Sequence, residues 1–282
     1  MIALKAWAKI NLGLKILNKR DDGFHNIETT LTTTNLADFI RIEETDSGII
    51  IDTQGLNMPA EENLCYQAAD LFKKKYGVEK GVRINLIKNI PIGGGLGGGS
   101  SDAAAVLKGM RELYALNIND EELMELSKDI GLDVPFFIKG GAAYARGKGD
   151  ELKFFKLPRM SLIIYYPGYS ISTKWAYQAY DEFIVASPQP DPEVFLEKDS
   201  GKKKNKKERK GFPLANDFEK VIFKHHPDLV DVKTRLLMAG CFLVSLSGSG
   251  SCLYTLNDES MRDKALAYLA GIGAQYFEVS TI

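Results

Sequence analysis

Residues 91–102, which read PIGGGLGGGSSD, are the segment of this sequence with the clearest chemical meaning. Six of the seven residues 93–99 are glycines, and glycines let a backbone approach an anion closely. Amides at the start of a following helix would point at that anion with the positive end of the helix dipole. Ser100 and Ser101 add hydroxyls that suit a phosphate or its bound Mg²⁺, and that suit a helix cap equally well. The segment therefore predicts a polyphosphate-binding loop rather than a flexible linker.

Three known types of phosphate-binding loop compete for this segment. A Walker A loop has a lysine after its last glycine, and Ser100 stands there instead, which excludes that type. The glycine loop of protein kinases precedes a strand, whereas residues 100–110 have the spacing and alanine content of a helix. The Rossmann pattern G-x-G-x-x-G fits from residue 93, but it requires a parallel strand after the helix, and residues 118–130 predict another helix. A Rossmann NAD-dependent oxidoreductase thus stays as a weaker alternative.

Three further polar residues have types and positions that suit catalysis. Lys9 and Asn11 share the polar face of a predicted first strand, roughly 6–7 Å apart, so that one substrate could touch both. Asp133 follows the helix-ending Gly131 and precedes the apolar run 134–138, where a helix gives way to buried chain. From the pattern alone, a solubilising surface charge is the simpler interpretation of Lys9, and a turn residue is a common interpretation of Asp133.

Hydrophobic periodicity predicts the elements that would position these residues. Alternation and β-branched residues predict strands at 1–16, 26–44, 81–90, 135–155, 160–168, 241–246 and 252–256. Helical spacing with caps predicts helices at 61–76, from 100–102 onward, and at 118–130, 169–183, 217–226, 231–240 and 259–269. A small-residue turn at 246–251 joins two of the apolar strands.

Composition and charge exclude several other classes of protein. The chain has 282 residues, 45% of them hydrophobic, which is enough for one large or two modest domains. With 36 basic and 37 acidic residues, the net charge of −1 argues against a nucleic-acid binder. Three widely spaced cysteines and three histidines predict neither a disulfide framework nor a zinc site. Lys5 and Lys9 interrupt the apolar N-terminus, and no segment has the length of a membrane span, so we expect a cytoplasmic protein.

Residues 187–213 differ in character from the rest of the chain. Positions 202–210 hold seven basic residues and one acidic residue, a local charge of +6. Such a run favours a solvated loop, with an anion-binding lid as the alternative.

The segment 91–104, PIGGGLGGGSSDAA, closely resembles the phosphate-loop motif of the GHMP small-molecule kinases, which lack the Walker lysine. Four further blocks fall in the order expected for one member of that family: AKINLGL at 8–14, DDGFH at 21–25, GLDVPFF at 131–137 and LSGSGSCLY at 246–254. The resemblance covers nearly the whole chain except the lysine-rich insert. Five blocks in order are far harder to meet by chance than one glycine pattern.

The resemblance implies an α+β fold of two α/β domains, neither Rossmann nor P-loop, with the active site in the cleft between them. We expect an N-terminal domain over 1–155 that carries the phosphate loop, and a C-terminal domain over 156–282 with an insert at about 198–211. The implied activity is ATP-dependent phosphorylation of an alcohol, with Mg²⁺ carried by ATP. The member that the blocks match acts on a cytidine diphosphate sugar alcohol, and kinases of mevalonate or homoserine are the alternatives within the family.

The resemblance also implies roles for residues that match the family's motifs. Lys9 matches the catalytic lysine, which stabilises charge, and Asp133 matches the catalytic aspartate, which orients or deprotonates the alcohol. Phe24 would stack on the cytosine and His25 would hydrogen-bond its edge, although the family more often has tyrosine at position 24. The residues expected to bind this substrate are Asn11, Phe24, His25, Thr173 and Tyr177, with Trp175 as the other candidate for a second stacking wall.

The expected ATP site follows from the same match. Its residues are Asn63, Pro91, Gly93, Gly94, Gly95, Leu96, Gly97, Gly98, Gly99, Ser100, Ser101, Ser247, Gly248 and Ser249. The protein is expected to supply no metal ligand other than Ser100 or Ser101 acting through Mg-ATP. We expect no nucleic-acid, membrane or obligate protein partner.

Overall fold

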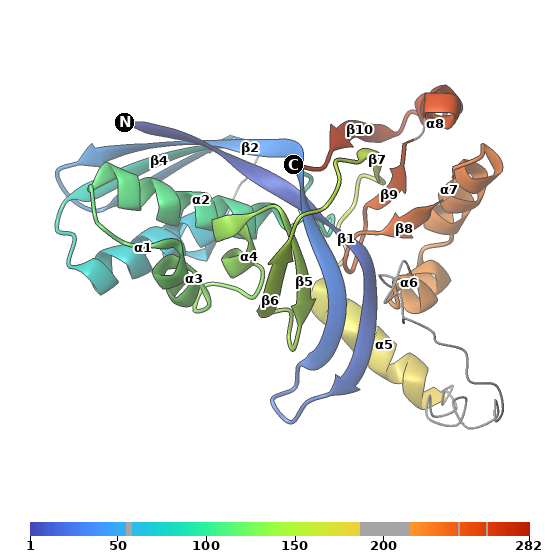
Figure 1. Ribbon diagram of the computed structural model, residues 1–282, viewed down its shortest axis with the longest axis horizontal. Coiled ribbons are helices and arrows are strands. Elements are labelled where there is room, and N and C mark those ends of the chain that lie inside the picture. The colour runs from blue at the N-terminus through green and yellow to red at the C-terminus, as the bar shows by residue number, and fades with distance from the viewer. Residues whose placement is uncertain (55–57, 187–214, 242, 258) are drawn as a thin grey trace.

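The protein is described by a computed structural model over residues 1–54, 58–186, 215–241, 243–257 and 259–282. Within these ranges, two β-sheets lie side by side along the long axis of the molecule, and helices cover both of them (Figure 1). The strands are β1 (Ile2–Lys19), β2 (His25–Thr45), β3 (Ile49–Gln54), β4 (Gly81–Ile87), β5 (Ala142–Arg146), β6 (Glu151–Phe155), β7 (Ser161–Tyr166), β8 (Val244–Leu246), β9 (Leu253–Leu256) and β10 (Gln275–Ser280).

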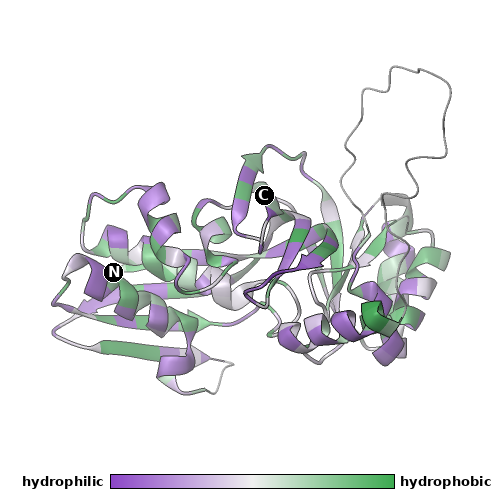
Figure 2. Ribbon diagram, turned by 90° about the horizontal axis from the view of Figure 1, so that it is seen from below, coloured by the Kyte–Doolittle hydropathy of each residue, from purple (hydrophilic) through white to green (hydrophobic). Residues whose placement is uncertain are grey.

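The helices comprise one short 3₁₀ turn and eight α-helices in the described ranges. They are η1 (Ala60–Glu62), α1 (Leu64–Tyr76), α2 (Gly98–Leu113), α3 (Asp120–Ser127), α4 (Val134–Lys139), α5 (Thr173–Ala186), α6 (Glu219–His225), α7 (Pro227–Met238) and α8 (Glu259–Gly271). Figure 2 shows hydrophobic and hydrophilic residues alternating along the helices of both halves, which is typical of elements with one buried side. This mixture of helices and sheets is the predicted α+β class.

The first sheet is built around a long antiparallel ribbon of β1 and β2 that extends from one end of the molecule toward the second half (Figure 1). The strand order is β3-β4-β2-β5-β6, with β1 paired to β2, and β3 runs parallel to β4. Register shifts between Trp7 and Lys9, and again between Asn11 and Leu14, interrupt the pairing of β1. Because bulges re-aim side chains, these shifts fix the direction of the polar residues between them.

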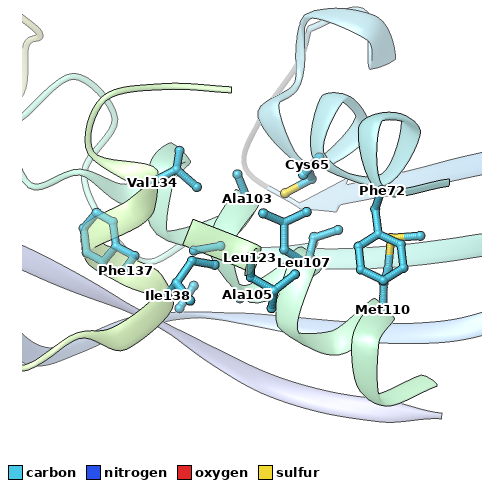
Figure 3. Close-up of a cluster of buried hydrophobic side chains, with 14 of the residues drawn as sticks. Cys65, Phe72, Ala103, Ala105, Leu107, Met110, Leu123, Val134, Phe137 and Ile138 are labelled. Atoms are coloured by element: carbon cyan, nitrogen blue, oxygen red, sulfur yellow. The ribbon is translucent and has the colours of Figure 1, made fainter. Parts of the chain in front are cut away.

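Helices α1 to α4 pack on one face of this sheet and enclose its hydrophobic core (Figures 1 and 3). Phe72 of α1 lies beside Met110 of α2, and Leu123 of α3 belongs to the same cluster (Figure 3). Ala103 and Ala105 of α2 are fully buried, and such small side chains let the helix approach the sheet closely. The packing therefore fixes α2, whose first turn follows the glycine loop directly.

The second sheet has the order β10-β7-β9-β8, and helices α5 to α8 pack around it. Its core includes Leu14, Ile16 and Ile27, so the far part of the β1–β2 ribbon belongs to this cluster as well. A third buried cluster joins Ala8 and Ile10 of β1 to strands of the second sheet. The division at residues 155 and 156 stays a prediction, because the two halves share these contacts.

One predicted element is wrong in part, and strands β3 and β10 were not predicted. The predicted strand at 135–155 begins instead as helix α4, and only its later part forms β5 and β6. Residues 134–138 are all buried, and a short continuous apolar run cannot be assigned to a strand or a helix by periodicity alone. Pro135 starts the helix and Gly140, with φ of 69°, ends it. Strand β10 was not predicted, because QYFEVS shows weak alternation.

Two further findings concern whole segments. The lysine-rich insert at about 198–211, for which a loop or a lid is predicted, lies outside the described residues. Among the described helices, none has the length and apolar character needed to cross a membrane.

Candidate active site

One cavity of about 610 Å³ collects most of the residues that the sequence predicts to be functional. Its walls come from β1, β2, the glycine loop, the start of α1, the turn before α4, α5 and the β8–β9 hairpin. Segments of both sheets therefore meet here. The predicted residues on its walls are Lys9, Asn11, Asn63, Pro91, Gly93, Gly94, Gly95, Leu96, Gly97, Gly98, Gly99, Ser100, Asp133, Thr173, Tyr177, Gly248 and Ser249.

The glycine loop has a shape that side chains would prevent. Gly95 and Gly97 have φ of 77° and 69°, a region that other residues rarely adopt. A Cβ on Gly95 would lie 2.0 Å from the carbonyl oxygen of Ser247, and one on Gly97 would lie 2.8 Å from the ring of Phe137. Helix α2 begins at Gly98 and no side chain caps its first turn, so its first amides remain available to an anion.

Lys9 lies at the centre of a polar network on β1. Its Nζ donates a 2.5 Å hydrogen bond to Asn11 Oδ1, and the Asn11 amide donates a 3.0 Å bond to Thr29 Oγ1. The backbone amide of Lys9 donates a hydrogen bond to the carbonyl of Leu96, and this bond connects β1 to the glycine loop. Lys9 is only 5% exposed, and this burial lowers its pKa, against the opposing charge of Asp133. Lys9 is thus a buried ammonium that lines the cavity, and not the solubilising surface charge that the pattern alone suggests.

Asp133 stands at the N-cap position of α4 but makes no capping hydrogen bond. Its Oδ2 lies 3.8 Å from Lys9 Nζ, and its side chain is 38% exposed. The Asp133 carboxylate can therefore accept hydrogen bonds from a ligand in the cavity. Tyr177, across the same cavity, has its pKa raised to about 12 by burial and by the charge of Asp133.

The β8–β9 hairpin packs directly on the glycine loop. Ser247 Oγ donates to the carbonyl of Gly95 at 3.0 Å, and the Cys252 amide donates to the carbonyl of Gly94 at 3.1 Å. Ser247 is fully buried and lies behind the loop, whereas Ser249 reaches the cavity and shares a 2.9 Å hydrogen bond with Thr173. The predicted contact of Ser247 with ATP stays a prediction.

Two other residues that were expected to contact ATP, Asn63 and Ser101, differ in whether they line the main cavity. Asn63 caps α1 by accepting a hydrogen bond from the Cys65 amide, while its buried Nδ2 has no partner among the described residues. A free donor on the cavity wall suits an acceptor on a nucleotide base. Ser101 instead lines a separate hollow with Lys108 and Phe137, so Ser100 alone of the two serines reaches the main cavity.

The residues expected to bind the cytosine form a group at one end of the cavity. Tyr177 lines the wall and stacks on His25, with ring centroids 4.9 Å apart and planes 11° from parallel. Phe24 is 48% exposed, and Lys148 Nζ lies 5.0 Å from its ring centroid. Neither Phe24 nor His25 belongs to the cavity wall itself. Trp175 packs edge-on against two histidines elsewhere, which leaves Tyr177 as the better candidate for the second stacking wall.

A second charged cluster lies beside the glycine loop and was not predicted, and two of its members, Lys88 and Asp102, also line the cavity. Lys88 Nζ bonds to Asp38 and, at 2.6 Å, to Asp102, and all three side chains are nearly inaccessible. Asp38 also accepts from the amides of Asn89 and Ile90. Burial raises the pKa of Asp102 to about 8, with Lys88 opposing and Asp38 adding to this rise. The cluster holds both ends of the segment 88–102 together.

No group of three or more acidic, histidine or cysteine side chains suited to a metal occurs in the described part of the chain. The cavity offers the Ser100 hydroxyl and the Asp133 carboxylate, both of which are oxygen ligands of the kind that Mg²⁺ prefers. These residues fit a Mg²⁺ ion that arrives with a nucleotide and keeps several of its waters.

Comparisons with known families agree with this arrangement. Residues 63–141 match the family described as GHMP kinases N terminal domain, and residues 204–274 match GHMP kinases C terminal. The chain is 41% identical over 271 residues to 4-diphosphocytidyl-2-C-methyl-D-erythritol kinase of Chlorobium chlorochromatii, which covers 94% of this chain and 90% of that protein. It is 38% identical over 282 residues to the kinase of the same name from Bacillus pumilus, covering 99% and 96%.

Solved structures show the same relationship. A crystal structure of 4-(cytidine 5'-diphospho)-2C-methyl-D-erythritol kinase matches with a TM-score of 0.79 at 34% identity, over 99% of both chains. The mevalonate kinase of Methanococcus jannaschii matches with a TM-score of 0.67 at 18% identity, over 100% of this chain and 98% of that one. The second likeness shows the shared fold alone.

Proposed function

The chain belongs to the GHMP kinases and, among them, to the 4-diphosphocytidyl-2-C-methyl-D-erythritol kinases, and from this premise we propose how its cavity performs the reaction. The reaction transfers the γ-phosphoryl group of ATP to the 2-hydroxyl of 4-diphosphocytidyl-2-C-methyl-D-erythritol, in the non-mevalonate route to isoprenoid precursors. The observation that carries the mechanism is the 3.8 Å ion pair of Lys9 and Asp133 in the cavity that the glycine loop also lines. The relatives that carry this name set aside the Rossmann oxidoreductase and the mevalonate and homoserine kinases.

The glycine loop and the first turn of α2 would hold the triphosphate. Glycines 93–99 bring backbone amides to the cavity without side chains in front of them, and the α2 dipole adds positive potential. Asn63, with its unpartnered Nδ2, would donate to the adenine. Gly248 and Ser249 would close the site from the second sheet.

Phosphoryl transfer then needs an oriented hydroxyl and a stabilised charge. The oxygen of the 2-hydroxyl forms a bond to the γ-phosphorus as the bond between that phosphorus and the β–γ bridging oxygen breaks, and ADP leaves. Asp133 accepts a hydrogen bond from the hydroxyl, orients it, and receives its proton. Lys9 stabilises the negative charge on the transferring group, and Asn11 holds the Lys9 ammonium in place at 2.5 Å.

The cytidine end of the substrate would lie against Tyr177 and Phe24, which offer aromatic faces at one end of the cavity. Thr173 shares a hydrogen bond with Ser249 and lines the cavity together with Tyr177, and it would contact the diphosphate or the sugar alcohol. Phe24 retains the stacking surface of the tyrosine more common at this position, without its hydroxyl.

Mg²⁺ would enter with ATP, and it would neutralise charge on the β- and γ-phosphate oxygens. We further propose a cytoplasmic location, since all three cysteines, Cys65, Cys241 and Cys252, are buried and free of disulfides. The substrate is a small molecule, and we propose no nucleic-acid, membrane or obligate protein partner.

A coupled assay of ADP release tests this function. We expect ATP-dependent turnover with 4-diphosphocytidyl-2-C-methyl-D-erythritol and none with CDP or mevalonate. Turnover of mevalonate without turnover of the cytidine substrate would contradict the assignment.

A further inference from the structure

Asp181 lies behind the pyrimidine end of the cavity, where no sequence pattern marks it. Its Oδ1 is 2.6 Å from His25 Nε2, and its Oδ2 accepts a 2.6 Å hydrogen bond from Lys19 Nζ. The contact joins α5 to the β1–β2 ribbon, which are far apart in the sequence. His25 is 7% exposed, so its ring has little freedom to turn away from this partner.

The contact with Asp181 decides which nitrogen of His25 carries a proton. Hydrogen bonds from Lys19 and His25 lower the pKa of Asp181 although burial opposes them, so this carboxylate is ionised at neutral pH. An ionised carboxylate only accepts hydrogen bonds, and Nε2 must therefore donate. In a neutral imidazole that donates from Nε2, Nδ1 is an acceptor. No hydrogen bond occupies Nδ1 among the described residues.

The stacking geometry shows where a base would meet that acceptor. Tyr177 lies 11° from parallel to the His25 ring. A pyrimidine in the plane of the imidazole, hydrogen-bonded to its Nδ1 edge, would therefore lie nearly parallel to the Tyr177 ring. Cytosine carries an amino donor at position 4, whereas uracil carries an oxygen acceptor there.

We propose that Asp181 is the positioning residue for base selection, because it holds His25 in the tautomer whose Nδ1 accepts from the cytosine amino group. Uracil would place its 4-oxygen against this acceptor, and two acceptors repel. This inference rests on the proposed function, since it concerns the cytidine part of the same substrate. It adds Asp181 and the selection against uridine, which the function alone does not supply.

Kinetics of Asp181→Asn and Asp181→Ala test the inference, with the cytidine substrate and its uridine analogue compared. Asparagine offers either an oxygen or an amino group to Nε2, so both tautomers become accessible. We expect the ratio of kcat/KM for cytidine over uridine to fall about tenfold in both variants, since one hydrogen bond is at stake. The change should lie mainly in KM for the cytidine substrate, with kcat within about twofold. Asp231→Asn, an exposed carboxylate paired with Arg235, is the matched control and should keep the ratio.

A ratio that is unchanged in folded Asp181 variants would overturn the inference while leaving the proposed function intact. If the wild-type protein turned over neither substrate, the proposed function itself would fall. If the Asp181 variants do not fold, the tautomer of His25 can still be measured in the wild-type protein. The chain has three histidines, so ¹⁵N shifts of the imidazoles can be assigned with His25→Gln. We expect the Nε2–H tautomer in the wild type with substrate bound, and an Nδ1–H tautomer would contradict the inference.

Discussion

Two lysine–carboxylate clusters flank the glycine loop, and they differ in how much of their bonding capacity the fold uses. In the first, Lys9 and Asp133 are 3.8 Å apart, and the carboxylate is 38% exposed to the cavity. In the second, Lys88 contacts both Asp38 and Asp102, and the three side chains are 8%, 0% and 3% exposed. We call them the cavity pair and the buried cluster. The contacts of the cavity pair leave bonding capacity for a substrate, and we propose that this pair serves catalysis whereas the closer contacts of the buried cluster serve the fold.

The difference follows from the cost of burying charge. A buried ion pair is stable only when its partners are well placed, and removal of one partner leaves an uncompensated charge. The buried cluster meets this condition at Asp38, whose hydrogen bonds also fix the amides of Asn89 and Ile90, whereas Asp102 Oδ1 has no partner among the described residues. The cavity pair leaves the Asp133 carboxylate short of donors, and a substrate hydroxyl can supply one. Substitutions should therefore separate catalysis from stability.

The largest effect is expected for Asp133→Asn. Loss of the carboxylate removes the group that orients and deprotonates the hydroxyl, so kcat should fall by about 10²- to 10⁴-fold. Nucleotide affinity and melting temperature should stay near the wild-type values, since Asp133 makes no capping bond. ADP release and a nucleotide titration measure both. Turnover close to that of the wild type would remove Asp133 from the mechanism.

Lys88→Met should have the opposite profile. It leaves the buried Asp38 carboxylate and the Asp102 carboxyl group without their cation, so the free energy of unfolding should fall by about 3–5 kcal/mol. Because the cluster holds both ends of the segment 88–102, KM for ATP should rise more than kcat falls. Urea denaturation and steady-state kinetics report the two effects. A variant as stable as the wild type would show that the buried cluster is not structural.

Lys9→Met should lower kcat by about 10²- to 10³-fold through loss of charge stabilisation. In contrast to Lys88→Met, it should not destabilise the fold, because burial already lowers the pKa of Lys9 and so makes its charged form costly. The two methionine variants are matched controls for each other. If Lys9→Met and Lys88→Met lost the same free energy of unfolding, the proposed difference between the cavity pair and the buried cluster would be contradicted.

Asp102→Asn should have the smallest effect, and one that depends on pH. The pKa of Asp102 is raised to about 8 in the folded state, so its contribution to stability is present below the unfolded pKa and is lost as pH rises toward 8. Asparagine removes that loss, and the variant should gain about 2–3 kcal/mol relative to the wild type between pH 6 and pH 9, at about 1.4 kcal/mol per pH unit up to pH 8. Urea midpoints at several pH values measure this. A constant difference across the range would contradict the raised pKa.

The sequence predicts the cavity pair but not the buried cluster, and the reason is physical. The glycines form a local motif with recognisable spacing, and Lys9 and Asp133 lie in short blocks that the family resemblance identifies, although their pattern alone does not. Asp38 and Lys88 are brought together by the pairing of β2 with β4, and no local pattern encodes such a contact. The contact of Asp181 with His25 likewise depends on where α5 packs.

The fold was predicted best where periodicity is long and unmixed. The alternation in β1 and the caps of α1 and α3 mark these elements clearly, with Asn63 and Asn119 as observed caps. The uniformly apolar residues of α4 carry no period, and they were assigned to a strand. Burial on all sides, which decides that segment, depends on tertiary packing.

A crystal structure with a non-hydrolysable ATP analogue and the cytidine substrate tests the central claim most directly, namely that bare amides of the glycine loop hold the triphosphate beside the cavity pair. We predict phosphate oxygens on the amides of residues 93–101, and the 2-hydroxyl about 2.6–3.2 Å from an Asp133 carboxylate oxygen. Phosphates bound elsewhere, with the loop empty and Asp133 facing solvent, would contradict it.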